Sequence, residues 1–306
     1  MTVLNERVTT DNNALIQDKS TKSLIKRSIQ YIKAGYPVHF TGPSGSGKTS
    51  IALALAKKIK RPVMLMHGNH ELDNKDLIGS FNGYTSSKVV DQYVRSVYKK
   101  DETVTESWKD GRLLEAVKHG YTLVYDEFSR SRPATNNIFL SILEEGVLPL
   151  YGLKSTEPFL KVHPKFSVIF TSNPDEYSGV YQTQDALLDR LITLHVGFKG
   201  KDQEAVIIRE KLGIDRKGAE IISGLIHELR EEFGNRKGAP SLRTSLQIAR
   251  IAKLEDIPIN GSRQDFQQLC LDLLGHSVVQ GLGLKIEEAN ELILEVCKKM
   301  KEEERG

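Results

Sequence analysis

Cysteine and long apolar runs are both scarce in this sequence, and each absence excludes a class of protein. The two cysteines, Cys270 and Cys297, show no CxxC spacing, so the sequence predicts buried thiols rather than a disulfide framework or a zinc knuckle. The longest apolar run, residues 51–56, is far shorter than the roughly 20 residues that cross a bilayer. The N-terminus also lacks the basic and then apolar pattern of a signal peptide. We therefore expect a cytoplasmic protein without membrane insertion.

An excess of charge of either sign is also missing. The 43 Lys and Arg residues nearly balance the 40 Asp and Glu residues, which gives a formal net charge of +3. A dedicated nucleic-acid binder normally has a concentrated basic face, so this balance argues against nucleic acid as a partner. With 39% hydrophobic and 27% charged residues, the 306-residue chain has the composition of a soluble globular protein with one large domain or two modest ones.

Helical and strand-like patterns alternate in the first two thirds of the chain. Residues 1–18 are polar with little periodicity and are predicted to form a mobile tail. Helices are expected at 19–33 and 50–59, and a third is expected from Pro133 to Gly146. Short apolar strands are expected at 37–40, 63–66, 121–125 and 166–170. This alternation predicts a parallel α/β sheet.

Two hairpins are expected as insertions into this pattern. Between Gly79 and Asp110 the sequence breaks into strand-like pieces around the polar residues 99–102, which predicts a hairpin. A second hairpin is expected to pair residues 147–150 with 159–162.

Beyond about residue 197 the strand-like pattern gives way to helical periodicity. This shift in composition predicts a boundary between an α/β domain at 19–197 and an all-helical domain at 198–306. The expected helices lie at 202–212, 216–233, 241–254, 262–280 and 285–301.

The strongest functional signal is a loop that matches the phosphate-binding pattern GxxxxGK[ST]. A predicted strand precedes it and a predicted helix follows it, so successive backbone N–H groups and the helix N-terminus converge on one anion site. Lys48 would reach the β- and γ-phosphates, and the Thr49 hydroxyl would take a ligand position on Mg²⁺. The predicted nucleotide-binding residues are Gly42, Pro43, Ser44, Gly45, Ser46, Gly47, Lys48, Thr49 and Ser50.

Two adjacent carboxylates, Asp126 and Glu127, follow the apolar strand at 121–125. At the C-terminal end of a strand, both can turn toward a phosphate loop on a neighbouring strand. Asp126 would then hold Mg²⁺, directly or through water, and Glu127 would polarise the attacking water. An acidic pair at a strand end is commonplace alone, but after a phosphate loop it predicts nucleotide hydrolysis.

A polar amide, Asn173, lies just past the strand at 166–170. If that strand lies between those that lead to the phosphate loop and the acidic pair, Asn173 can orient the water or contact the γ-phosphate. Taken alone, it is better explained as a turn-forming Asn before Pro174.

Together, the phosphate loop, the acidic strand end, Asn173 and the helical region resemble the AAA+ ATPases. The runs at 76–79, 111–113 and 189–191, with the first hairpin, resemble the MoxR branch, which includes the CbbQ and NorQ activases. Within that branch, a long contiguous match is similar to the gas vesicle protein N family. The resemblance extends over about residues 20–280, and the contiguous match comprises residues 108–114, 119–133, 136–137 and 143–146.

The resemblance implies ATP with Mg²⁺ and roles for two arginines. Arg190 corresponds to the arginine finger that reaches a neighbouring subunit's nucleotide, and Arg243 to the sensor arginine of the helical lid. Without the family, each would be interpreted as a surface or salt-bridged arginine. Arg130 and Arg132, just past the acidic pair, are rival candidates for the trans-acting role and rank below Arg190. The absence of an NKxD guanine-reading motif agrees with ATP rather than GTP.

We therefore expect an ATP hydrolase with an α/β ATPase domain and a helical lid. The finger implies a homo-oligomer, and the resemblance implies a hexameric ring. It also implies a part in gas vesicle formation, with vesicle structural or accessory proteins as clients that are remodelled or loaded, and a place in the cytoplasm or on the vesicle.

Three alternatives stay open from the sequence. The first is a CbbQ- or NorQ-like activase of a metabolic enzyme. The second is a structural component of the vesicle that binds nucleotide and hydrolyses it negligibly, although Glu127 argues against a pure binder. The third, a DNA-processing ATPase, is weakened by the charge balance.

Overall fold

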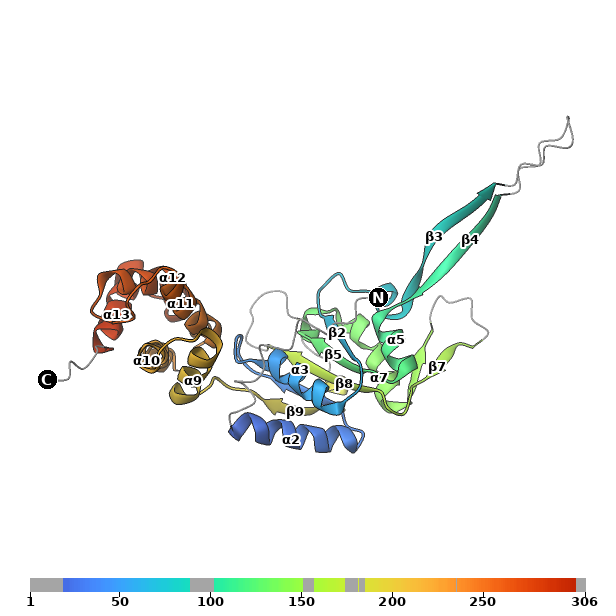
Figure 1. Ribbon diagram of the computed structural model, residues 1–306. Helices are drawn as coiled ribbons and strands as arrows, with labels where there is room; N and C mark the ends of the chain where they lie inside the picture. Colours follow the sequence, from blue (N-terminus) through green and yellow to red (C-terminus); the bar gives the residue numbers. More distant parts are fainter. Residues whose placement is uncertain are drawn as a thin grey trace, which may run out of the picture.

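The computed structural model describes residues 19–88, 102–150, 157–173, 181, 185–234 and 236–300. The predicted mobile tail at 1–18 and most of the polar tip of the first hairpin lie outside these residues. An α/β domain and a helical domain lie side by side, and a long hairpin projects from the α/β domain (Figure 1).

Five parallel strands form the central sheet, in the order β2-β5-β8-β1-β9. The strand that precedes the phosphate loop, β1, is in the interior of the sheet, next to β8, and β8 separates it from β5. The strands are β1 (Val38–Thr41), β2 (Val63–His67), β5 (Thr122–Asp126), β8 (Ser167–Ser172) and β9 (Ile192–His195).

Helices cover both faces of the sheet. Successive residues of a strand point to opposite faces, so each strand contributes apolar side chains to both cores. Val124 and Ile169 pack with α2 (Lys19–Lys33) and α3 (Lys48–Ile59) on one face. Their neighbours Tyr125 and Phe170 pack on the other face, in a core shared with short helices. Those helices are α4 (Asn74–Ile78), α5 (Arg112–His119), α7 (Ile138–Glu144) and α8 (Asp185–Leu188). A 3₁₀ turn, η1 (Phe128–Arg130), follows β5, and α6 (Pro133–Asn136) precedes α7.

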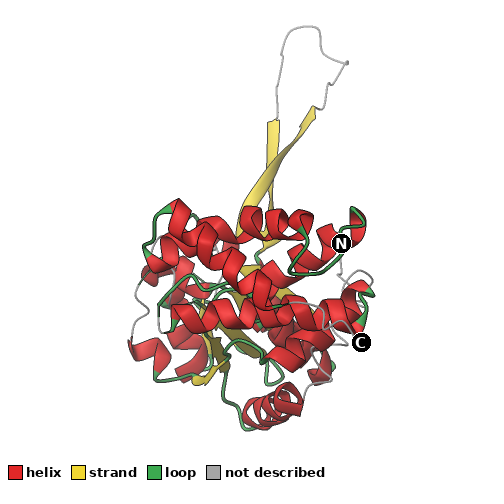
Figure 2. Ribbon diagram, turned by 90° about the vertical axis from the view of Figure 1, so that its left-hand side faces the viewer, coloured by secondary structure: helices red, strands yellow, loops and turns green. Residues whose placement is uncertain are grey.

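Both expected hairpins are present. The longer one, β3 (Gly79–Lys88) and β4 (Glu102–Asp110), is antiparallel and stands away from the body of the molecule (Figure 2). The shorter one pairs β6 (Val147–Pro149) with β7 (Phe159–Lys161).

From Lys201 onward, all described elements are helices. Their buried apolar faces form one core, and Cys270 and Cys297 are free thiols within it, as expected. Leu242 and Ile207 pack instead with residues of the α/β domain, so the two domains share an apolar contact. The helices are α9 (Lys201–Leu212), α10 (Arg216–Phe233), α11 (Leu242–Leu254), α12 (Gln264–Leu282) and α13 (Ile286–Lys299).

The fold class expected from the sequence, an α/β core with a helical lid, is confirmed, with two corrections. The sheet has a fifth strand, β9, that was not expected, because its run of four residues is short and alternates in burial at the sheet edge. The helix expected from Pro133 to Gly146 is divided into α6 and α7. Asn136 turns its amide inward at this break, donating to the Phe128 carbonyl and accepting from the Tyr125 hydroxyl.

Among the described residues, no single helix is long and apolar enough to cross a membrane; α12 and α13 pass that test only as a pair, bent by 119°.

Candidate active site

The phosphate loop lies between β1 and α3, at the carboxyl end of the sheet, and its glycines are required by its backbone. Gly42, Gly45 and Gly47 all have positive φ angles, of 148°, 71° and 92°. Side chains other than hydrogen rarely tolerate such angles. A Cβ on Gly42 would also lie 2.2 Å from the Val196 carbonyl oxygen. The expected loop conformation is therefore specified by these positions, with Pro43 and Ser44 at its partly exposed outer turn and Ser50 in the first turn of α3.

Two buried polar side chains inside the loop fit a bound phosphate. The Lys48 side chain turns back into the loop and donates to the carbonyl oxygens of Gly42 (2.8 Å) and Pro43 (2.7 Å). The Ser46 hydroxyl is buried and has no hydrogen-bond partner among the described residues. A buried hydroxyl without a partner costs free energy. A polyphosphate would supply acceptors for both groups.

Thr49 and Asp126, the two residues predicted to hold Mg²⁺, contact each other directly. The Thr49 hydroxyl donates a 2.7 Å hydrogen bond to Oδ1 of Asp126, and the Thr171 hydroxyl donates a second one of 2.5 Å. Nδ1 of His67 lies 3.3 Å from Oδ2. Among the residues that the structure describes, no three His, Cys, Asp or Glu side chains are grouped to hold a metal. A divalent ion here would therefore take its remaining ligands from water and phosphate oxygens, as Mg²⁺ commonly does.

Glu127 sits in a left-handed backbone conformation, with φ 52° and ψ 41°, directly after β5. Its backbone N–H donates to the Thr171 hydroxyl over 2.9 Å, and a Cβ on Gly68 would lie 2.2 Å from its carbonyl oxygen. Oε2 of its carboxylate lies 2.9 Å from Nε of Arg130. Left-handed non-glycine residues are strained and cluster at functional sites. Thr171 and Gly68 were not singled out from the sequence, because single Thr and Gly residues near strand ends are common.

Asn173 is buried just past β8, and the condition set for its role is met because β8 lies between β5 and β1. His39 of β1 forms hydrogen bonds with both neighbouring strands. Its Nε2 lies 2.8 Å from Oγ of Ser172 in β8, and its Nδ1 lies 3.0 Å from Oγ1 of Thr193 in β9. Burial lowers the pKa of His39 to about 4, so its ring is neutral at physiological pH. Sequence reasoning missed His39, which has no motif around it.

Arg190 does not approach the phosphate loop of its own chain. It precedes β9, and β9 runs parallel to β1 with Ile192 opposite Val38. Arg190 is therefore at the amino edge of the sheet, and the phosphate loop is at the carboxyl edge. Its guanidinium donates to the Ala186 carbonyl and to the Glu144 carboxylate.

The N-terminus of α11 lies against the phosphate loop. Ser241, the N-cap of this helix, accepts a 3.2 Å hydrogen bond from the backbone N–H of Arg243. A Cβ on Gly45 would lie only 2.4 Å from both the Cβ and the hydroxyl of Ser241. Arg243 is exposed and lies in the first turn of α11, two residues after Ser241. Arg132, one of the rivals for the finger, is exposed at the start of α6.

Taken together, the loop offers Lys48 and Ser46 to a polyphosphate, the contact between Thr49 and Asp126 offers oxygen ligands to a divalent ion, and Glu127 and Asn173 follow the neighbouring strands β5 and β8 at the same end of the sheet. This set of groups is the one required for hydrolysis of a nucleoside triphosphate.

Comparison with known proteins agrees with this chemistry. Residues 37–191 match the family model for an AAA domain of the dynein-related subfamily. The chain is also 41% identical over 269 residues to "Gas vesicle ATPase GvpN" of Ancylobacter aquaticus, which covers 88% of this chain and 75% of that protein. The chain belongs to the GvpN family of AAA ATPases. The GvpN-like resemblance expected from the sequence is confirmed, and the chain is accordingly an ATPase that binds nucleotide.

Two further relatives are also named gas vesicle ATPases. The chain is 36% identical to the gas vesicle ATPase GvpN of Haloferax mediterranei, over 90% of this chain and 78% of that one. It is 35% identical to GvpN1 of Halobacterium salinarum, over 94% and 83%. A crystal structure of NtrX from Brucella abortus in complex with ADP superposes with a TM-score of 0.50 at 16% identity, over 92% of this chain and 63% of that chain. At that identity the likeness shows the fold alone.

Proposed function

We propose that this chain uses Mg²⁺-dependent ATP hydrolysis to support gas vesicle formation in the cytoplasm, by remodelling or loading vesicle shell proteins. The observation on which the hydrolytic part depends most is the Thr49–Asp126 hydrogen bond of 2.7 Å, which joins the phosphate loop to the acidic strand end. The vesicle part is supported by the relatives named gas vesicle ATPase GvpN.

In this proposal each site residue has one task. Lys48 and the loop N–H groups bind the phosphates, and Thr49 and Asp126 hold Mg²⁺, which neutralises developing charge on the phosphate oxygens. Glu127 accepts a proton from the attacking water, and Asn173 orients that water.

The two arginines would complete the site from outside the sheet. Arg243, on α11 beside the loop, would place a fixed fork of donors against the charge of the transition state. Arg190, at the opposite edge of its own sheet, can serve only a neighbouring subunit. We therefore propose a homo-oligomeric ring, of six subunits, in which every nucleotide lies between two chains.

Cells that make gas vesicles test the proposal directly. With its native gene replaced by the Lys48→Ala variant, the host is expected to lose buoyant vesicles, because the loop then lacks the cation that binds the phosphates. Lys58→Ala is the matched control, since Lys58 is exposed on the same helix and should leave vesicle formation unchanged. Normal flotation with Lys48→Ala would refute a role for ATP in assembly.

A pull-down tests the client. Glu127→Gln should bind ATP without hydrolysing it, so a stalled complex should retain a gas vesicle structural or accessory protein when ATP is present. Glu145→Gln, an exposed carboxylate at the end of α7, serves as the control and should retain none. Capture of a metabolic enzyme instead would favour a CbbQ- or NorQ-like activase.

A further inference from the structure

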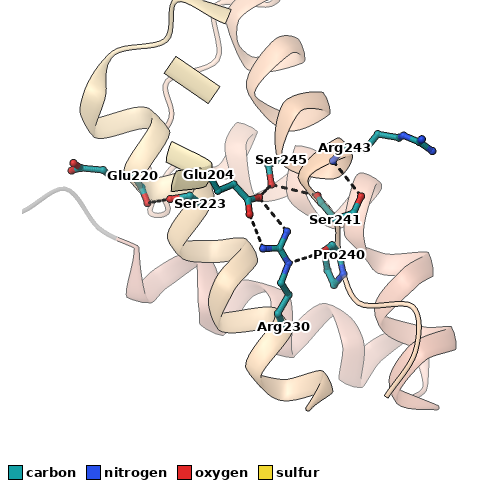
Figure 3. A network of polar contacts seen from close by, with 8 residues as sticks. All are labelled: Glu204, Glu220, Ser223, Arg230, Pro240, Ser241, Arg243 and Ser245. Atoms are coloured by element: carbon teal, nitrogen blue, oxygen red, sulfur yellow. Dashed lines mark hydrogen bonds and ion pairs between the residues drawn. The ribbon is translucent and has the colours of Figure 1, made fainter. Parts of the chain in front are cut away.

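A buried ion pair joins the first two helices of the helical domain (Figure 3). Glu204 of α9 is fully buried, and only 8% of the Arg230 side chain on α10 is exposed. The pair is bidentate, with Nη1 of Arg230 donating to Oε2 of Glu204 over 2.6 Å and Nη2 donating to Oε1 over 3.2 Å. Paired donors of this kind hold both side chains in one orientation.

The same pair also contacts α11, the segment that precedes α11 and the segment that joins β9 to α9. Nε of Arg230 donates a 2.6 Å hydrogen bond to the carbonyl of Pro240, and the Ser245 hydroxyl donates to the Glu204 carboxylate. The guanidinium lies over the ring of Phe198, 4.5 Å from its centroid. One ion pair therefore ties together the linker from β9, α9, α10 and α11.

Its contacts to α11 bracket the turn that faces the phosphate loop. Pro240 precedes the N-cap Ser241, and Ser245 lies one turn later, with its hydroxyl 3.5 Å from the Ser241 carbonyl oxygen. Ser241 is the residue that packs against Gly45 of the loop. Figure 3 shows the Arg243 side chain pointing away from the ion pair, so Arg230 can influence Arg243 only through the backbone of this turn.

A contribution to the stability of the fold does not by itself explain why a buried ion pair is present here. Removing two charges from water costs free energy, and well-packed apolar replacements of similar volume are often as stable or more stable. What apolar side chains cannot supply is the directed hydrogen bond to the Pro240 carbonyl and the acceptor for Ser245.

We propose that Arg230 and Glu204 are positioning residues for ATP hydrolysis. They hold the first turn of α11 in register with the phosphate loop and thereby fix where Arg243 presents its guanidinium. The inference rests on the proposed role of Arg243. Neither Arg230 nor Glu204 contacts the nucleotide in this account.

The first test separates position from stability. The Glu204→Leu/Arg230→Met double variant replaces the pair with apolar side chains. It is expected to remain folded, with a small decrease in melting temperature because the Pro240 carbonyl loses its donor, while kcat for ATP falls about 10- to 100-fold at nearly constant KM. If the double variant does not fold, Arg230→Lys provides the test instead. It keeps the positive charge but loses the planar fork of donors, so it should also lower kcat. Arg216→Met is the matched control, because Arg216 forms an exposed pair with Glu220 on the same helix. A folded double variant with wild-type kcat would overturn the proposal.

A double-mutant cycle with Arg243→Ala provides the second test. If the ion pair acts through Arg243, adding the Glu204→Leu/Arg230→Met change to Arg243→Ala should lower kcat by no more than about twofold further. If the fold-decreases in kcat of the two changes multiply in the combined variant, the positioning role is overturned while the role of Arg243 stays intact. Wild-type turnover of Arg243→Ala alone would instead refute the proposed sensor role.

Discussion

Nε of Arg130 lies 2.9 Å from Oε2 of Glu127, three residues earlier in the chain. The carboxylate proposed to activate water is thus held by a guanidinium of its own subunit. About 40% of each side chain is exposed, so the pair is worth only about 0.5 kcal/mol. Such a contact is weak enough to be exchanged for water during turnover.

We expect Arg130→Gln to raise basal kcat about twofold, because it releases the Glu127 carboxylate from a contact of that strength. Arg209→Gln, at an exposed position on α9, is the control and should leave kcat unchanged. Steady-state phosphate release measures both. A large loss of activity in Arg130→Gln would contradict this expectation and favour Arg130 over Arg190 for the trans-acting role.

The position of Arg190 at the amino edge of the sheet predicts complementation between subunits. Arg190→Ala and Glu127→Gln proteins should each be inactive, because each lacks one half of every site. A mixture should regain part of the activity at interfaces where an intact Glu127 faces an intact Arg190. The ATPase rate is measured across mixing ratios, and an absence of rescue at every ratio would contradict a role in trans.

Much of this site could be predicted from the sequence because its parts are local. The phosphate loop, Asp126 and Glu127 each follow a strand, and the parallel topology brings strand ends to one edge. The short strand β9 and the network around His39 could not be predicted in this way, since His39 meets Ser172 and Thr193 from strands far apart in the sequence. The Glu204–Arg230 pair was missed for a different reason, because charged residues on helices are usually exposed.

The close contact between Gly45 and Ser241 predicts that the loop tolerates no side chain there. Gly45→Ala would force a left-handed alanine, at a cost of about 1 kcal/mol, and push Ser241 away, so ATP should bind about five- to tenfold more weakly. Gly200→Ala is the control, because a Cβ there meets nothing within 4 Å at an ordinary φ of −67°. Titration with a fluorescent ATP analogue measures both affinities, and equal values would contradict the contact.

Burial of His39 predicts a specific loss of stability in acid. Between pH 6.5 and about 4 the unfolded chain binds a proton at His39 that the folded protein does not, because the folded pKa is lowered to about 4. The free energy of unfolding should therefore fall by about 3 kcal/mol as the pH decreases through this window, and should be unaffected by His39 above it. Denaturant unfolding of wild type and His39→Gln across this pH range isolates the contribution of His39 to the free energy of unfolding. Parallel pH profiles of the two proteins would show that His39 does not contribute.

The central claim, that Glu127 activates water at an otherwise complete ATP site, is tested most directly by comparing ATP turnover and ATP binding in the Glu127→Gln variant. Replacing a proton acceptor by an amide of the same shape removes only the proton transfer, so turnover should fall by about 100-fold or more while the Kd for ATP changes little. Undiminished turnover in Glu127→Gln would contradict the account.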